Sequence, residues 1–200
     1  MNTNIVIVEG YDGSGKGTLI ERLRESLGGK RVRVLGRKTE VELRPISLLI
    51  EQTPPTLCKE TEILLRIALE FERLELLRRA QSEWDIIMLD RGIISLVSWV
   101  DYYDLDSRRY ASLFSTLESA LDGAKVLICS CDFETCWRRA LEKETKSKKE
   151  LLGEATNRRY YEKYMRNVEL FRNRNSLVST VDTTCSIAAS LNHALSDLSL

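Results

Sequence analysis

The sequence predicts an α/β fold with three layers, in which helices cover both faces of a parallel sheet of five strands. Two observations support this fold class. Short apolar runs alternate along the chain with long helical patterns, and such connections place a parallel sheet between two helical layers. The 200 residues also suffice for one α/β domain with a sizeable core, and no repeat or linker divides them. We therefore expect a single domain over residues 1–200.

The predicted strands are the short apolar runs. They span residues 4–8, 31–35, 86–89, 124–129 and 177–181. The run Ile5-Val6-Ile7-Val8 is apolar at every position, which is typical of a strand buried on both faces of a parallel sheet. The run 31–35 alternates basic and apolar residues, so we expect it to be less buried.

The predicted helices carry apolar residues at helical spacing. They span residues 18–27, 60–82, 93–103, 107–121, 133–143, 154–173 and 187–198. In the first of them, Leu19, Leu23 and Leu27 recur on one face, and Gly28-Gly29 ends the pattern. Pro54-Pro55 predicts a loop before the long helix 60–82.

The composition excludes several classes of protein. Thirty basic residues balance thirty acidic ones, so no overall field attracts nucleic acid or a membrane surface. No apolar stretch approaches the roughly 20 residues that span a bilayer. No secretory signal precedes the first apolar run at residues 5–8. We therefore expect a cytoplasmic protein without membrane association.

The five cysteines do not form the pattern of a disulfide framework, because their number is odd. Cys129, Cys131 and Cys136 cluster, but they lack a C-x-x-C pair, and the only histidine of the chain is His193. We interpret the three as buried thiols on a strand and the following helix, in preference to a zinc site.

A phosphate-binding loop is the most specific motif. Residues 9–18 read E-G-Y-D-G-S-G-K-G-T, and they follow a predicted buried strand and open an amphipathic helix. The glycines let successive N–H groups point at phosphate oxygens, while the helix N-terminus and Lys16 add positive charge. The nucleotide-binding residues are therefore predicted to be Gly10, Gly13, Ser14, Gly15, Lys16, Gly17 and Thr18. The loop predicts a P-loop NTPase fold and ATP as the ligand.

The position after the lysine departs from the common pattern. It usually carries Ser or Thr, whose hydroxyl helps to hold Mg²⁺, but here it is Gly17. The hydroxyl comes one residue later, on Thr18. We expect Thr18 and a carboxylate elsewhere in the site to serve the metal.

That carboxylate is predicted at the end of the strand 86–89, where Asp90 and Arg91 follow the last apolar residue. Ligands in open parallel sheets bind at the carboxyl ends of the strands, beside the loop of the first strand. An aspartate there can orient Mg²⁺, and an arginine can clamp a phosphoryl group.

With these motifs, the sequence resembles the thymidylate kinase family. The similar segments are G-x-D-G-x-G-K-x-T at residues 10–18, D-R-x-x-x-S at 90–95 and V-D-T at 181–183. The resemblance implies phosphoryl transfer from MgATP to a (deoxy)nucleoside monophosphate. It also implies a homodimer.

The resemblance further implies roles for single residues. Lys16 would hold the donor phosphates and Asp90 the metal, while Asp12 would meet the sugar hydroxyl of the acceptor. Arg91 would bind the acceptor phosphate or the group in flight, with Arg37 assisting. Ser95 would line the acceptor pocket.

The family has a mobile lid, which the resemblance places in the basic segment at about residues 142–158. Members with glycine at the position of Gly13 take a catalytic arginine from this lid. Its candidates here are Arg138, Arg139, Arg158 and Arg159, and Lys146, Lys148 and Lys149 could add charge.

One family pattern is absent from the long helix. Many members carry L-L-F-x-x-x-R, whose Phe stacks on the base and whose Arg grips the acceptor phosphate, whereas residues 64–70 read L-L-R-I-A-L-E. A carboxylate about 4 Å from a phosphate dianion is repelled by roughly 4 kcal/mol. Arg66 and Glu70 therefore predict that thymidylate is not held in the usual way. We expect Phe71 and Arg73 on other faces of the helix.

Two alternatives remain open at this point. The first is a kinase with a different acceptor hydroxyl, on a deoxynucleoside or on a modified base, including one within DNA. Glu70 could then orient the hydroxyl, and Trp99, Tyr102 and Tyr103 could contact the base or simply pack in the core. The second is a nucleotide-binding protein without catalysis, which only Gly17 supports.

Overall fold

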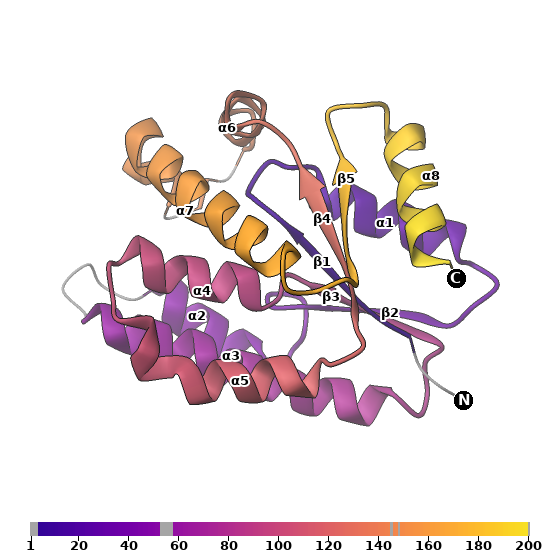
Figure 1. The fold of residues 1–200 in the computed structure, drawn as a ribbon, viewed down its shortest axis with the longest axis horizontal. Helices are drawn as coiled ribbons and strands as arrows, with labels where there is room; N and C mark the ends of the chain where they lie inside the picture. Colours follow the sequence, from indigo (N-terminus) through magenta and orange to yellow (C-terminus); the bar gives the residue numbers. More distant parts are fainter. Residues whose placement is uncertain (1–3, 53–57, 145, 148, 200) are drawn as a thin grey trace.

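Five strands form one parallel sheet in the order β2-β3-β1-β4-β5 (Figure 1). The computed structural model describes residues 4–52, 58–144, 146–147 and 149–199. The strands are β1 (Asn4–Gly10), β2 (Val32–Gly36), β3 (Ile86–Asp90), β4 (Lys125–Ser130) and β5 (Val178–Asp182). All five predicted strands are confirmed. The first residues of β2 are only half-buried, as its alternating pattern predicts.

The helices agree with the prediction apart from the segment before the long helix and the first turn of the predicted helix 107–121. They are α1 (Lys16–Ser26), α2 (Arg44–Gln52), α3 (Lys59–Ala80), α4 (Ile93–Tyr102), α5 (Ala111–Ala120), α6 (Phe133–Leu141), α7 (Glu154–Arg172) and α8 (Ile187–Leu198). The sequence did not predict α2, although Pro45 stands in its first turn, where a helix tolerates proline. Pro54-Pro55 lies outside the described residues.

Two short 3-10 helices complete the elements, η1 (Ser107–Tyr110) and η2 (Glu150–Leu152). The predicted helix 107–121 is therefore wrong in its first turn, which is η1 rather than α-helix. There the Asp106 carboxylate accepts a hydrogen bond from the backbone N–H of Arg108 and caps the turn.

Two hydrophobic cores lie on opposite faces of the sheet. Alternate residues of β1 point to opposite sides, so Ile7 joins one core while Val6 and Val8 join the other. The larger core lies between the sheet and α3, α4, α5 and α7, and the smaller one between the sheet and α1 and α8 (Figure 1). This arrangement confirms the predicted three layers.

The cysteines Cys129, Cys131 and Cys136 are buried and free, as the thiol interpretation predicts. Burial raises the pKa of the Cys129 thiol to about 12. Within the described ranges, no group of three or more His, Cys, Asp and Glu residues is arranged to hold a metal ion. None of the helices in these ranges has the length and apolar character that crossing a membrane requires.

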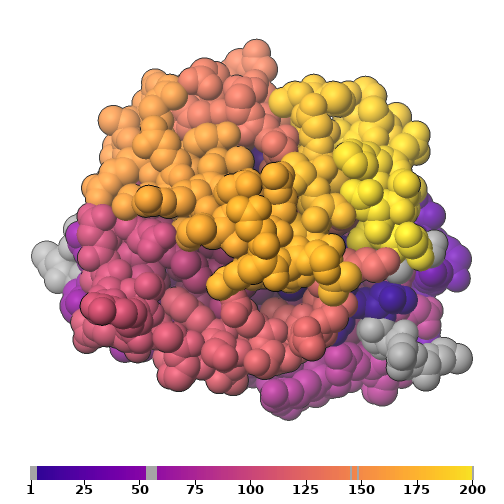
Figure 2. All heavy atoms as spheres, viewed as in Figure 1, coloured from indigo at the N-terminus to yellow at the C-terminus, as the bar shows by residue number. Residues whose placement is uncertain are grey.

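The sheet brings the predicted motifs to one edge. Val8 of β1 lies opposite both Asp90 of β3 and Leu127 of β4, so the loops after these strands are neighbours. In Figure 2, the C-terminal segment (yellow) and the α6–α7 region (salmon to orange) stand beside each other, and indigo atoms of the N-terminal part are visible in the hollow between them.

Candidate active site

The phosphate loop turns twice through left-handed backbone between β1 and α1. Gly13 and Gly15 both have φ near +81°, a conformation that side chains other than glycine rarely adopt. At Gly13 a Cβ would also lie 2.3 Å from the carbonyl oxygen of Cys136. The hydroxyl of Ser14 is buried and has no hydrogen-bond partner among the described residues. The loop thus keeps a polar atom ready for a ligand.

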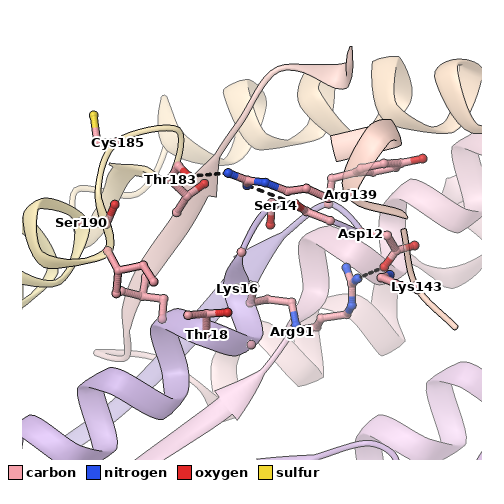
Figure 3. Close-up of a pocket in the computed structure, with 16 residues that line it drawn as sticks. Asp12, Ser14, Lys16, Thr18, Arg91, Arg139, Lys143, Thr183, Cys185 and Ser190 are labelled. Carbon is pink, nitrogen blue, oxygen red and sulfur yellow. Dashed lines mark hydrogen bonds and ion pairs between the residues drawn. The ribbon is translucent and has the colours of Figure 1, made fainter. Parts of the chain in front are cut away.

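A cavity of about 530 Å³ opens beside this loop (Figure 3). Besides residues 11–19, it is lined by side chains from the ends of the other strands and from the helices around them: Arg91, Arg139, Lys143, Thr183, Cys185, Ile187 and Ser190. Its size lies within the range of small-molecule and cofactor sites, roughly 300–1,000 Å³. Six of the seven predicted nucleotide-binding residues line the cavity. The exception is Gly10, where a Cβ would lie 3.0 Å from that of Cys129.

Lys16 and Asp90 meet at this edge of the sheet. The ammonium of Lys16 forms an ion pair with Oδ1 of Asp90. Burial and the nearby charge of Arg91 lower the pKa of Lys16, while Asp90 opposes that shift. Burial works against ionisation of Asp90, but the charge of Lys16 outweighs it and lowers the pKa of Asp90. Each of the two groups thus favours the charged form of the other.

Arg91 and Asp12 form a second ion pair, which Lys149 extends. Nη2 of Arg91 contacts Oδ1 of Asp12, and the Lys149 ammonium lies 2.7 Å from Oδ2. Nη1 of Arg91 donates to the Gly10 carbonyl oxygen at 2.7 Å, so its guanidinium lies directly against the phosphate loop. Burial disfavours the charged form of Asp12, but Lys149 and Arg91 outweigh burial and lower the pKa of this carboxyl.

Glu9 supports this arrangement, and the sequence analysis missed it. Its carboxylate is fully buried and accepts hydrogen bonds from the N–H groups of Gly92 at 2.8 Å and Ser95 at 3.1 Å. The Ser95 hydroxyl donates to the same carboxylate at 2.6 Å. Ser95, predicted to line the acceptor pocket, is buried, and it contacts Arg91 at 3.3 Å. The sequence signal that could have pointed to Glu9 is that an acidic residue stands at the start of the phosphate loop.

Glu70 does not stand alone, which corrects the repulsion expected from the sequence. It is buried, and its carboxylate pairs with two guanidiniums, those of Arg37 and Arg73. The trio carries one net positive charge at neutral pH. Arg73 lies three residues after Glu70 on α3, and the expectation that it faces another side of the helix is wrong.

Of the four candidate lid arginines, one lines the cavity. Arg139 lines the cavity, where its guanidinium donates to the carbonyl oxygens of Gly13 at 3.3 Å and Thr183 at 3.2 Å (Figure 3). Arg138 is exposed. Arg158 pairs with Glu134 and Glu154, Arg159 pairs with Asp104, and neither is among the residues that line the cavity. Lys146 is exposed, and Lys148 lies outside the described residues.

Lys149 is the lid cation that reaches the site. Its side chain is 7% exposed, and its ammonium faces the rings of Tyr160 at 4.0 Å and Tyr11 at 4.2 Å. The Asn157 amide donates to the Lys149 carbonyl oxygen at 2.8 Å, while the Tyr11 hydroxyl donates to Asn157 Oδ1 at 3.2 Å. These contacts join the basic segment to the phosphate loop.

The aromatic residues after Arg91 form a half-buried group along α4. The Trp99 ring lies 4.6 Å from that of Tyr160, and the Arg66 guanidinium stacks on it at 4.1 Å. Tyr103 donates from its hydroxyl to Glu62 at 2.9 Å. Arg66 therefore covers the ring of Trp99.

Comparisons with known proteins agree with this geometry. The family model for thymidylate kinase matches residues 8–191. The structure of thymidylate kinase from Candida albicans superposes with a TM-score of 0.75 at 17% sequence identity, over 99% of this chain and 92% of that one. That enzyme is described as having broad substrate specificity and a novel structural element. A search of curated proteins gave no match.

Proposed function

The chain belongs to the thymidylate kinase family and transfers a phosphoryl group from ATP to a nucleoside monophosphate, and we propose which of its residues hold each substrate. In this reaction an oxygen of the acceptor phosphate attacks the γ-phosphorus of ATP, and the bond to the β–γ bridging oxygen breaks. ADP leaves with that electron pair. The protein acts by positioning and by neutralising charge.

The cavity beside the phosphate loop is assigned to ATP. Lys16 and the backbone of residues 13–18 face the donor phosphates, and the buried hydroxyl of Ser14 gains a partner there. Arg139 lines the same cavity between Gly13 and Thr183. The residues present therefore fit a nucleoside triphosphate.

The acceptor phosphate is assigned to the end of the cavity at Arg91. The observation that supports this best is that Arg91 lines the donor cavity while pairing with Asp12, which places one guanidinium between donor and acceptor. Arg37 approaches from the loop after β2 and donates to the Gly92 carbonyl oxygen at 3.3 Å. Asp12 would then meet the sugar of the acceptor once Lys149 releases it.

Mg²⁺ fits the oxygen donors Asp90 and Thr18. Thr18 lines the cavity, and the Asp90 side chain is 36% exposed. When bound, the ion would neutralise charge on the β- and γ-phosphates. Asp90 is held by Lys16 in this structure, so donor phosphates that attract Lys16 would free its carboxylate.

The segment 142–158 is proposed as the lid of a single kinase domain over residues 1–200. Its contacts through Lys149 and Asn157 to the phosphate loop support this assignment, because a segment docked there excludes water from the transfer. By resemblance to the family, the proposal extends to a homodimer and to a cytoplasmic location, where ATP and nucleoside monophosphates are both available.

The test is a phosphoryl-transfer assay with a panel of dNMPs, nucleosides and hydroxymethyl-containing DNA. We expect transfer to at least one nucleoside monophosphate and none to the corresponding nucleoside. Since Glu70 is paired with two arginines, it no longer favours an acceptor without a phosphate. Preferred transfer to nucleosides or to DNA would refute the acceptor assignment, and ATP binding without any transfer would refute catalysis.

A further inference from the structure

Helix α3 buries a carboxylate and a guanidinium three residues apart. Glu70 is 6% exposed and Arg73 is 2% exposed. Removing two charges from water costs more than their attraction returns unless the geometry is favourable, and apolar residues of similar size often serve stability as well. Stability alone therefore does not explain why this pair is buried. The other contacts of Glu70 and Arg73 explain it.

Arg73 holds the turn that carries Asp90 and Arg91. Its Nη1 donates to the Asp90 carbonyl oxygen at 2.9 Å, and its Nη2 donates to that of Arg91 at 2.7 Å. The turn is strained, because Arg91 has φ +72° without being glycine. Glu9 holds the following N–H groups of the same turn. Arg73 and Glu9, two buried side chains of opposite charge, thus fix the turn. Arg73 holds its carbonyl groups, and Glu9 holds its N–H groups.

Glu70 holds Arg37 in the same way. Nε of Arg37 donates to Oε1 of Glu70 at 2.6 Å, while Arg73 pairs with the other carboxylate oxygen. One carboxylate therefore joins the loop after β2 to the turn after β3. The Arg37 side chain stays 19% exposed, so its guanidinium remains available to a ligand.

We propose that Glu70 and Arg73 are positioning residues for the acceptor phosphate. Glu70 orients the guanidinium of Arg37, and Arg73 fixes the turn from which Arg91 projects, so that the guanidiniums of Arg37 and Arg91 are both held in place for one acceptor phosphate. The inference rests on the proposed function. It identifies the acceptor as a phosphate-bearing nucleotide that is gripped by Arg37 and Arg91, although α3 offers no arginine of its own to it.

The first experiment compares Glu70→Gln with Glu75→Gln by steady-state kinetics on the best nucleoside monophosphate. Glu75 is a matched control, since it lies on the same helix and also pairs with two arginines, Arg78 and Arg79, but at the surface. In Glu70→Gln we expect KM for the acceptor to rise about 10-fold or more, while KM for ATP changes less than about 2-fold. Glu75→Gln should change neither constant. An unchanged acceptor KM in Glu70→Gln would overturn the inference.

A double-mutant cycle tests whether Glu70 acts through Arg37. In the Arg37→Ala background, Glu70→Gln should cause a clearly smaller loss of kcat/KM for the acceptor than in the wild-type background, because the guanidinium that it orients is gone and only its pair with Arg73 remains. Additive losses would indicate a general structural role and contradict the proposal. The Arg73→Lys variant should lower kcat about 10-fold or more. This loss should not be accompanied by a large fall in Tm.

A second variant covers the case in which Glu70→Gln does not fold. Arg37→Lys lies at a partly exposed position and keeps the positive charge, but it lacks the Nε–H that Glu70 holds. The acceptor KM must rise in this variant as well, and an unchanged value would overturn the inference. If the wild type transfers phosphate to no nucleoside monophosphate, the proposed function itself fails. If the wild type transfers phosphate and Glu70→Gln has the same acceptor KM, only the positioning role is refuted.

Discussion

The ammonium of Lys149 lies 2.7 Å from Oδ2 of Asp12, although the two residues are far apart in the sequence. Tyr11 and Tyr160 face the same ammonium with their rings, at 4.2 and 4.0 Å. Burial lowers the pKa of Lys149, against the charge of Asp12. A cation from the proposed lid thus occupies the carboxylate that we assign to the acceptor sugar, so we expect opening of the lid and entry of the acceptor to be coupled.

Lys149→Ala should lower kcat by roughly 10- to 100-fold, because the variant loses the buried cation that pairs with Asp12 and docks the proposed lid on the phosphate loop. Lys146→Ala, at an exposed position in the same segment, is the control. Equal activities of the two variants would remove Lys149 from the mechanism.

The pH profile gives an independent test of Lys149. Since burial lowers its pKa, Lys149 loses its proton at a lower pH than an ordinary lysine, whose pKa is about 10.4. On the alkaline side, activity should therefore begin to fall at a pH below the ordinary pKa of lysine. The Lys149→Arg variant stays protonated, so its activity should extend to higher pH. If the alkaline limb of the Lys149→Arg profile lies at the same pH as that of the wild type, the titration belongs to Lys16, whose pKa burial also lowers.

Arg139→Ala should raise KM for ATP about 10-fold, because the variant loses the guanidinium that lines the donor cavity and bridges Gly13 to Thr183. The matched control is Arg138→Ala, which removes the same charge from the exposed neighbouring position. Steady-state kinetics at saturating acceptor give the comparison. A similar rise in both variants would point to a general charge effect.

Lys16→Ala should lose several kcal/mol of transition-state stabilisation while the fold stays intact. Lys16 contacts Asp90 at the edge of the donor cavity, and the variant leaves the β1 core untouched. Turnover is measured together with far-UV circular dichroism. Wild-type turnover in a folded variant would refute the donor site.

Removal of Mg²⁺ with a chelator should abolish transfer, and Asp90→Asn should raise the Mg²⁺ concentration that half-saturates activity. Thr18→Val tests the second oxygen donor in the same titration. Calorimetry of MgATP binding separates loss of the metal from loss of the nucleotide. A wild-type Mg²⁺ dependence in both variants would move the metal site elsewhere.

Gly13→Ala and Gly17→Ala should change stability in opposite directions. At Gly13 the new Cβ meets backbone at 2.3 Å, and the positive φ adds about 1–2 kcal/mol of strain. At Gly17, in the first turn of α1, a Cβ meets nothing within 4 Å, so alanine should stabilise by roughly 0.5–1 kcal/mol. Urea unfolding of the two variants provides the measurement, and a stable Gly13→Ala would contradict the described loop.

The phosphate loop was predictable because its chemistry is local. Gly13, Gly15 and Lys16 are close in the sequence, and the loop follows a strand and opens a helix wherever that strand lies in the sheet. The strands and most helices were equally predictable from apolar spacing. The helix α2 was not predicted, although its buried residues Ser47 and Ile50 lie three positions apart, at helical spacing.

The pairing of charges, in contrast, is decided by tertiary structure. The sequence alone determined that Glu70 stands where the family carries an arginine, and it predicted repulsion. Only the packing of α3 beside the loop after β2 places Arg37 on that carboxylate, and only the return of the chain to the phosphate loop places Lys149 on Asp12. Arg73, three residues after Glu70 on the same helix, is within reach by spacing alone. An ion pair depends on the distance between two side chains, and neither composition nor spacing contains that distance for residues on different elements.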